Sequence, residues 1–258
     1  MKIGTVPYVL SYTVAAQLAA LLFTAILAPL EGQVTFAPVQ GDAGPFLNTL
    51  IFLAFPVVGS LLYLKFFKKK AFTYVYALGE ATLVSILSFL ILGFAGLDLT
   101  PAAVIGLAVG AAGFLVLVYG KTRAKGAFSL LLSAEAGAYL ALVFAPPTLY
   151  VVILAFALYD YYSVNRGPLK KVVEQVPFGA LSVDFGSISL GLGDELFYSM
   201  MPSAAYIMSG LGAALLMLVV VDAGVVATLM LLRKRKALPG LTIPLLLALG
   251  LFAILSFV

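Results

Sequence analysis

The sequence predicts an all-α polytopic membrane protein with nine transmembrane helices. Of its 258 residues, 63% are hydrophobic and only 10% are charged, whereas soluble domains carry about 25% charged residues. Nine apolar segments follow one another with short connections, and most approach the ~20 residues that span a bilayer as a helix. The lysines and arginines lie only in alternate connections. Together these observations predict that the chain has no separate soluble domain.

The nine segments are delimited by charges, prolines and turn residues. They are residues 7–29, 46–64, 72–94, 102–120, 127–145, 148–164, 186–208, 213–232 and 240–258. The sixth is the shortest, near the lower limit for a spanning helix. The first has no A-x-A-type cleavage site, so we expect a retained helix rather than a signal peptide.

The basic residues predict the orientation. All 15 lysines and arginines fall into five groups, at Lys2 and within residues 65–70, 121–125, 166–171 and 233–236. These groups lie at the N-terminus and after segments two, four, six and eight. The positive-inside rule therefore places the N-terminus in the cytoplasm and the C-terminus outside. We expect one domain over 1–258, made of six helices (1–165), a cytoplasmic loop (166–185) and three helices (186–258).

Two residue types are absent, and their absence excludes several chemistries. The chain has no cysteine and no histidine. Thiol nucleophiles, Ser-His catalysis, HExxH zinc sites and haem ligation by histidine are therefore excluded. If the protein is a hydrolase, carboxylates, hydroxyl groups or lysines must carry the reaction. The basic groups flank apolar segments, so they indicate topology rather than a nucleic-acid site.

Two aspartates lie inside predicted helices, Asp160 in the sixth and Asp194 in the seventh. A carboxylate at membrane depth costs roughly 2.5–3.5 kcal/mol, so such residues usually have a function. Asp160 precedes Arg166, at the cytoplasmic end of its segment, by ~9 Å along a helix. Asp194 lies about seven or eight residues into its segment, ~10–12 Å deep from the same side. The two carboxyl groups are expected to face each other at one depth.

A close pair of carboxyl groups does not ionise twice, and it shares one proton. One member can activate water while the other protonates a carbonyl oxygen, which is general acid–base hydrolysis of the aspartic-protease type. Gly191 and Gly193 leave space beside Asp194 and weaken the helix there. The predicted catalytic residues are Asp160 and Asp194.

Three short motifs resemble the presenilin family of intramembrane aspartic proteases. Tyr159-Asp160 is similar to the YD motif of that family, and residues 191–194 (Gly-Leu-Gly-Asp) are similar to its GxGD motif. Residues 239–241 (Pro-Gly-Leu) resemble its PAL motif, with Gly240 in place of alanine. The motifs cover about a quarter of the chain, and the predicted nine-helix topology resembles the family over the rest.

The resemblance implies cleavage of single-span membrane proteins inside the bilayer, without a metal or other cofactor. It implies that Tyr159, Gly191, Leu192, Gly193, Pro239, Gly240 and Leu241 bind the substrate, with residues 176–190 and 239–241 pairing with it as an added strand. The long, cleaved insertion of presenilins is missing. This resembles a prokaryotic homologue, a multi-pass protein of the cell membrane that acts without accessory subunits; an oligomer is compatible with the sequence.

Two other functions stay open from the sequence. A signal-peptide-clearing enzyme of the same family would use the same aspartates on substrates of the opposite orientation. A proton-coupled transporter would use intramembrane acids such as Glu80, Glu135 and Asp222 as a relay, although the halves show no inverted repeat. We expect Glu195 to face away from Asp194, and Asp222 to bond a hydroxyl group on another helix.

Overall fold

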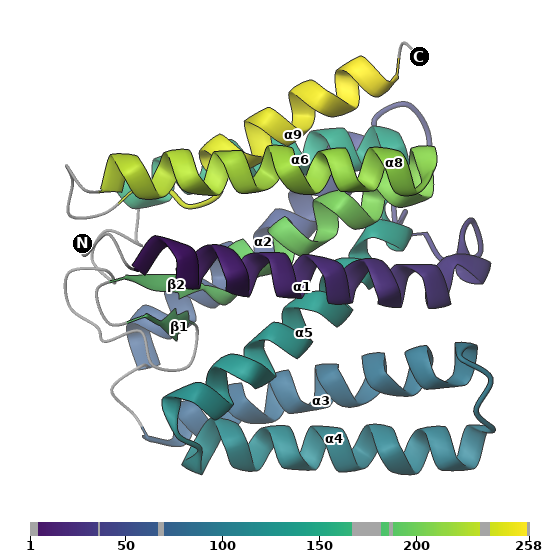
Figure 1. The fold of residues 1–258 in the computed structure, drawn as a ribbon, viewed down its shortest axis with the longest axis vertical. Helices are drawn as coiled ribbons and strands as arrows, with labels where there is room; N and C mark the ends of the chain where they lie inside the picture. Colours follow the sequence, from purple (N-terminus) through teal and green to yellow (C-terminus); the bar gives the residue numbers. More distant parts are fainter. Residues whose placement is uncertain are drawn as a thin grey trace.

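The computed structural model describes residues 5–35, 37–66, 70–166, 182–185, 188–232 and 238–256. These residues form helices and one β-hairpin (Figure 1). The elements are α1 (Thr5–Leu27), η1 (Ala28–Leu30), α2 (Gly44–Phe66), α3 (Lys70–Phe94), α4 (Leu99–Tyr119), α5 (Thr122–Val143), α6 (Pro146–Asn165), β1 (Ser182–Asp184), β2 (Ser189–Gly191), α8 (Leu192–Leu232) and α9 (Thr242–Leu255).

The protein is an integral membrane protein built from apolar helices. Within the described part of the chain, six helices are long and apolar enough to cross a bilayer, namely α1, α3, α4, α5, α6 and α8. α9 is shorter, with 14 residues. The prediction of a helical, polytopic membrane protein is confirmed, whereas the number of nine spans stays a prediction.

The helices form a bundle in which α1 and α5 are central. α1 packs between α5 and α8, and α6 packs against both α2 and α9 (Figure 1). α3 and α4 form a tight pair at one edge of the bundle. That pair depends on small residues, because a Cβ added to Gly110 would lie 2.7 Å from the backbone oxygen of Ala81.

α8 contains both the seventh and the eighth predicted segments. It runs over 41 residues without a loop, and its backbone leaves the helical conformation at Gly210, where φ is 80° and ψ is −173°. A side chain would be strained at this positive φ, which glycine adopts freely. The hydropathy pattern predicts two helices joined by a short connection; in the structure that connection is one glycine.

The predicted start of the seventh helix was wrong. Residues 188–191 do not belong to a helix: β2 pairs antiparallel with β1, and Val183 lies opposite Leu190. Ile188 and Leu190 are buried while Ser189 is exposed, which is the two-residue period of a strand. The helix therefore begins at Leu192, six residues later than residue 186.

Candidate active site

Asp160 lies in the last third of α6, and its side chain is 7% exposed. Its Oδ2 atom accepts hydrogen bonds from the backbone amides of Leu241 (2.7 Å) and Thr242 (3.1 Å) and from the Thr242 hydroxyl (3.3 Å). These donors belong to the first turn of α9, where backbone amides have no partner inside the helix. The start of α9 therefore stabilises negative charge on Asp160.

Asp194 lies in the first turn of α8, two residues after the helix begins. The apolar segment in the sequence predicts a position seven or eight residues inside the helix, and the strand at residues 189–191 accounts for the difference. Its carboxylate accepts a hydrogen bond from the backbone amide of Gly191. This contact resembles a capping box, in which an acid at the third helical position reaches back to the residue before the helix.

The turn at residues 238–241 brings the two carboxyl groups together. Leu241 donates to Asp160, and the residue before it, Gly240, lies against the carboxylate of Asp194. The charge of Asp160 acts directly on Asp194. Consecutive residues of one turn thus contact both aspartates, which come from helices separated along the chain.

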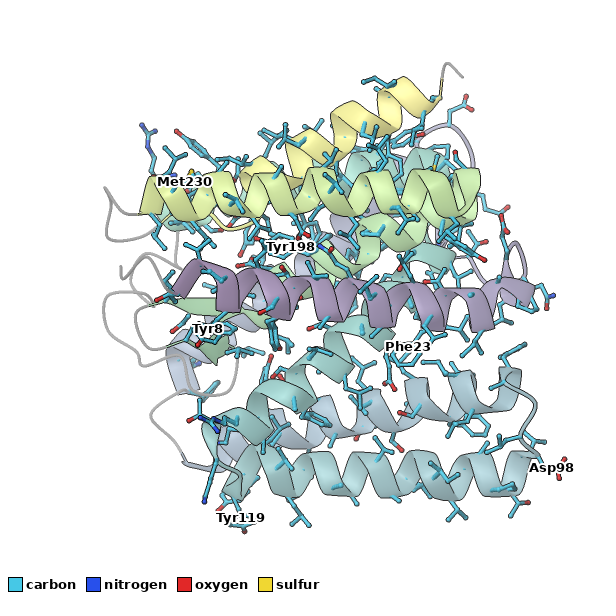
Figure 2. All side chains as sticks on the ribbon, in the orientation of Figure 1. Tyr8, Phe23, Asp98, Tyr119, Tyr198 and Met230 are labelled. Carbon is cyan, nitrogen blue, oxygen red and sulfur yellow. The ribbon has the colours of Figure 1, made fainter. Side chains whose placement is uncertain are left out.

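Gly240 is required by this packing. A Cβ added at that position would lie 2.9 Å from Cγ of Asp194 and closer still to Oδ2. Because real Cβ contacts do not approach 3.0 Å, the alanine of the PAL motif would not fit here without movement. The backbone oxygen of Gly240 accepts a 2.8 Å hydrogen bond from the hydroxyl of Tyr198. Tyr198 lies in the interior of the bundle and is 1% exposed (Figure 2).

The remaining predicted substrate-binding residues lie around the same turn and the start of α8. Pro239 and Leu241 are buried, Leu192 is half-buried and Gly193 is exposed. The Tyr159 hydroxyl is buried and has no hydrogen-bond partner among the described residues. Residues 176–181, 186 and 187 of the predicted substrate-binding strand lie outside the described residues, whereas residues 182–184 form β1 and residues 189–191 form β2.

Sequence reasoning did not identify Thr242 or assign a role to Tyr198. The Thr242 hydroxyl has a single hydrogen, which is shared between Oδ2 of Asp160 (3.3 Å) and the backbone oxygen of Ala157 (3.1 Å). A threonine at the start of a predicted helix, directly after the PAL-like residues, was the available signal.

The other intramembrane acids lie outside this turn. Asp222 accepts from the Thr13 hydroxyl (3.4 Å) and the Gln17 amide (3.2 Å), so the expected bond to a hydroxyl on another helix is present. Glu135 accepts from the Ser88 hydroxyl at 2.7 Å. Within the described ranges, no group of three or more Asp, Glu, His or Cys side chains is arranged to hold a metal ion.

No family model and no curated protein matches the sequence. A solved structure of a presenilin family intramembrane aspartate protease matches 98% of this chain and 99% of its own length, with a TM-score of 0.73 and 18% identity. The chain has the presenilin fold. A second crystal form of such a protease matches 95% of this chain and 96% of its own, with a TM-score of 0.62 and 20% identity.

Proposed function

We propose that this protein is an intramembrane aspartic endopeptidase, which hydrolyses peptide bonds in the transmembrane segments of single-span proteins. One observation carries the proposal: the turn at residues 238–241 holds Asp160 through Leu241 and contacts Asp194 through Gly240. A buried acid, Asp160, and a half-buried one, Asp194, held together inside a bundle of membrane-spanning helices suit general acid–base hydrolysis. The presenilin fold supports the same reading.

The hydrogen bonds suggest how the roles divide. Asp160 accepts three donors on one oxygen, so we assign it the negative charge and the role of general base. Asp194 then holds the shared proton. Asp160 takes a proton from water as the water oxygen attacks the carbonyl carbon, and Asp194 gives its proton to the carbonyl oxygen. The tetrahedral intermediate collapses when Asp160 gives its proton to the amide nitrogen, Asp194 takes back a proton from one hydroxyl of the gem-diol, and the C–N bond breaks.

We further propose nine spans with a cytoplasmic N-terminus and an external C-terminus. Tyr8, Tyr119 and Met230 adjoin the N-terminal end and two basic connections, and all three lie at one end of the bundle, whereas Asp98 lies at the other (Figure 2). This separation agrees with the positive-inside rule. The aspartate pair would then lie toward the cytoplasmic side of a prokaryotic cell membrane.

The β-hairpin offers a way to hold the substrate. Transmembrane helices hide their peptide bonds, so a substrate must unwind before it is cut. The described sheet has two strands, and β2 leads directly into the first helical turn of α8, which contains Asp194. A substrate segment added to this sheet would present an extended backbone to the aspartates, with Tyr159, residues 191–193 and residues 239–241 around it.

The test is cleavage of a reporter single-span peptide by the purified protein in detergent. Asp160→Asn and Asp194→Asn should each abolish cleavage, while Asp98→Asn, an exposed acid at the start of α4, should keep it. A hydroxyl-containing transition-state isostere should inhibit the wild type. Cleavage that persists in both single variants would refute the proposal.

The sequence left two kinds of protease open, a presenilin-like protease and a signal-peptide-clearing enzyme. The preferred orientation of the substrate distinguishes them. Single-span reporters of both orientations, matched in helix sequence, should be compared. Preference for reporters with an external N-terminus would support the presenilin-like assignment, and the reverse preference would indicate a signal-peptide-clearing enzyme. No cleavage of either orientation would favour the transporter hypothesis for the same acids.

A further inference from the structure

A cavity separate from the aspartate site lies between the start of α1, the start of α5 and the β-hairpin. Its volume is about 660 Å³, within the range of about 300–1,000 Å³ that is typical of small-molecule sites. Neither Asp160 nor Asp194 is among the described residues that line it. The three elements meet at the end of the bundle that holds Tyr8 and Tyr119 (Figure 1, Figure 2). The cavity is therefore a second candidate binding site.

The walls of this cavity are held together by contacts among all three elements. The Tyr12 hydroxyl of α1 donates a 3.0 Å hydrogen bond to the backbone oxygen of Gly126 in α5. The Tyr12 ring also meets the ring of Phe185, directly after β1, edge to face, with 5.4 Å between the ring centroids. A Cβ added to Gly126 would lie 3.2 Å from Cγ1 of Val183, so α5 and β1 pack closely. The cavity is thus bounded by elements that contact one another, as preformed ligand sites are.

The lining of the cavity changes from polar to apolar along α5. This helix is long and apolar enough to cross a bilayer, so its first turn lies at the level of the lipid headgroups. Arg123 lies in that turn, and Leu130 lines the cavity seven positions later, about 10 Å further along the helix. Ala127 and Phe185 add to the apolar lining. A ligand that matches this lining has a charged end at the membrane surface and an apolar end in the hydrocarbon.

The charge of Arg123 has no counter-charge in the cavity. No acidic residue is among the lining residues in the described part of the chain, and Arg123 is exposed. A guanidinium group matches the geometry of a phosphate group, and the hydroxyl group of Thr122, which also lines the cavity, can donate to phosphate oxygens. Lys121 and Lys125 add two positive charges to the same segment, and basic residues at a membrane surface attract anionic headgroups.

We propose that this cavity binds one anionic phospholipid of the surrounding bilayer. The phosphate group of the lipid contacts Arg123, and one acyl chain lies along Ala127 and Leu130. A free phosphate ion would leave the apolar part of the cavity empty, and a purely apolar ligand would leave Arg123 without a counter-charge. The bound lipid also contacts the hairpin, whose strand β2 leads into α8. The site does not depend on the proposed protease activity.

Fluorescence quenching by brominated lipids tests the site. The chain contains no tryptophan, so Tyr8→Trp introduces a single reporter at the cavity. The full-length protein is placed in bilayer discs of phosphatidylcholine, and part of the lipid is replaced by brominated phosphatidylglycerol or by brominated phosphatidylcholine. We expect the anionic lipid to quench the reporter with an apparent affinity about 5-fold above that of the zwitterionic lipid.

Tyr119→Trp is the matched control. Tyr119 is 73% exposed and Tyr8 is 71% exposed, and both lie at the same end of the bundle (Figure 2). Tyr119 adjoins the basic residues of segment 121–125 but is not among the described lining residues, so its preference for the anionic lipid should be about 2-fold or less. Equal preference at both positions would overturn the proposal, because the basic segment alone would then attract the lipid. Absence of quenching in Tyr8→Trp would also overturn it, because the cavity would be closed to lipid.

Two pairs of substitutions, made in the Tyr8→Trp protein, test the two ends of the cavity. Arg123→Gln and Lys121→Gln remove the same charge, but of the two residues only Arg123 lines the cavity. Arg123→Gln should reduce the preference from about 5-fold to about 1-fold, whereas Lys121→Gln should retain most of it. Ala127→Phe fills the apolar part and should weaken quenching by both lipids, whereas Ala124→Phe, at an exposed position outside the lining, should not. Equal effects within either pair would contradict the proposed site.

Two further measurements separate the lipid from a free ion and avoid the reporter. Inorganic phosphate should not displace the brominated phosphatidylglycerol; displacement as ready as that by the unlabelled lipid would indicate a phosphate site and refute the lipid assignment. Native mass spectrometry needs no tryptophan. After removal of bound lipid and addition of phosphatidylglycerol, one lipid should stay bound to the wild type and to Lys121→Gln but not to Arg123→Gln. If Tyr8→Trp does not fold, this measurement decides, and a wild type that retains no lipid would overturn the proposal.

Discussion

Replacing Gly240 with alanine should damage the site while leaving the fold intact. The added Cβ would lie 2.9 Å from Cγ of Asp194, and comfortable carbon–carbon contacts are about 3.5–4.0 Å long. The carboxyl carbon must therefore retreat by roughly 0.6–1.1 Å. Since a misplacement of about 1 Å can cost about 10²-fold in rate, we expect kcat to fall about 10–100-fold, or about 1.4–2.7 kcal/mol in activation free energy.

The assay is steady-state cleavage of the reporter peptide, with kcat and KM determined separately. Gly250→Ala is the matched control, because a Cβ at this α9 glycine meets no atom within 4 Å. It should cleave at the wild-type rate, and both variants should unfold at similar temperatures. Wild-type kcat in Gly240→Ala would refute the reasoning, because it would mean that the Asp194 position is not constrained by this turn.

Three further substitutions test the contacts around the aspartates. Tyr198→Phe removes the 2.8 Å hydrogen bond to the backbone oxygen of Gly240, and the loss of about 1 kcal/mol should lower kcat about 5-fold. Thr242→Val removes the hydroxyl donor but keeps the backbone amide on Asp160, so we expect a decrease of about 3–10-fold. Gly137→Ala would place a Cβ 2.7 Å from a side-chain carbon of α8, and this overpacking should lower the free energy of unfolding by about 1–3 kcal/mol, measured by thermal denaturation.

Matched controls exist for each of these substitutions. Tyr161→Phe changes a tyrosine that is 58% exposed, and Thr82→Val removes an exposed hydroxyl bonded to the backbone of its own helix. Gly79→Ala adds a Cβ that meets nothing within 4 Å. If a control lowers kcat or stability as much as its test variant, the specific contact is not responsible for the effect.

The helical framework was predictable because long apolar runs and the placement of basic residues are strong, local signals. α6 was expected at 148–164 and is found at Pro146–Asn165. The start of α8 was not predictable in the same way. A short apolar run such as residues 186–194 is compatible with a strand or a helix, and only the pairing with β1 decides between them.

The contacts that assemble the aspartate site could not be derived from local patterns. Leu241 and Asp160 are 81 positions apart, and Gly240 and Tyr198 are 42 apart. Helix depth alone suggested that two carboxyl groups lie at a similar level. It gave no indication that the first turn of α9 supplies three donors to one of them, because that depends on how α9 docks against α6.

The turn at residues 238–241 contacts both aspartates and α8. It supplies the amide of Leu241 to Asp160, contacts Asp194 through Gly240, and is tied to α8 by the Tyr198 hydroxyl. Displacing this turn would release Asp160 and alter the space around Asp194 in a single movement. A small molecule that displaced Gly240 would therefore inhibit hydrolysis without imitating the transition state.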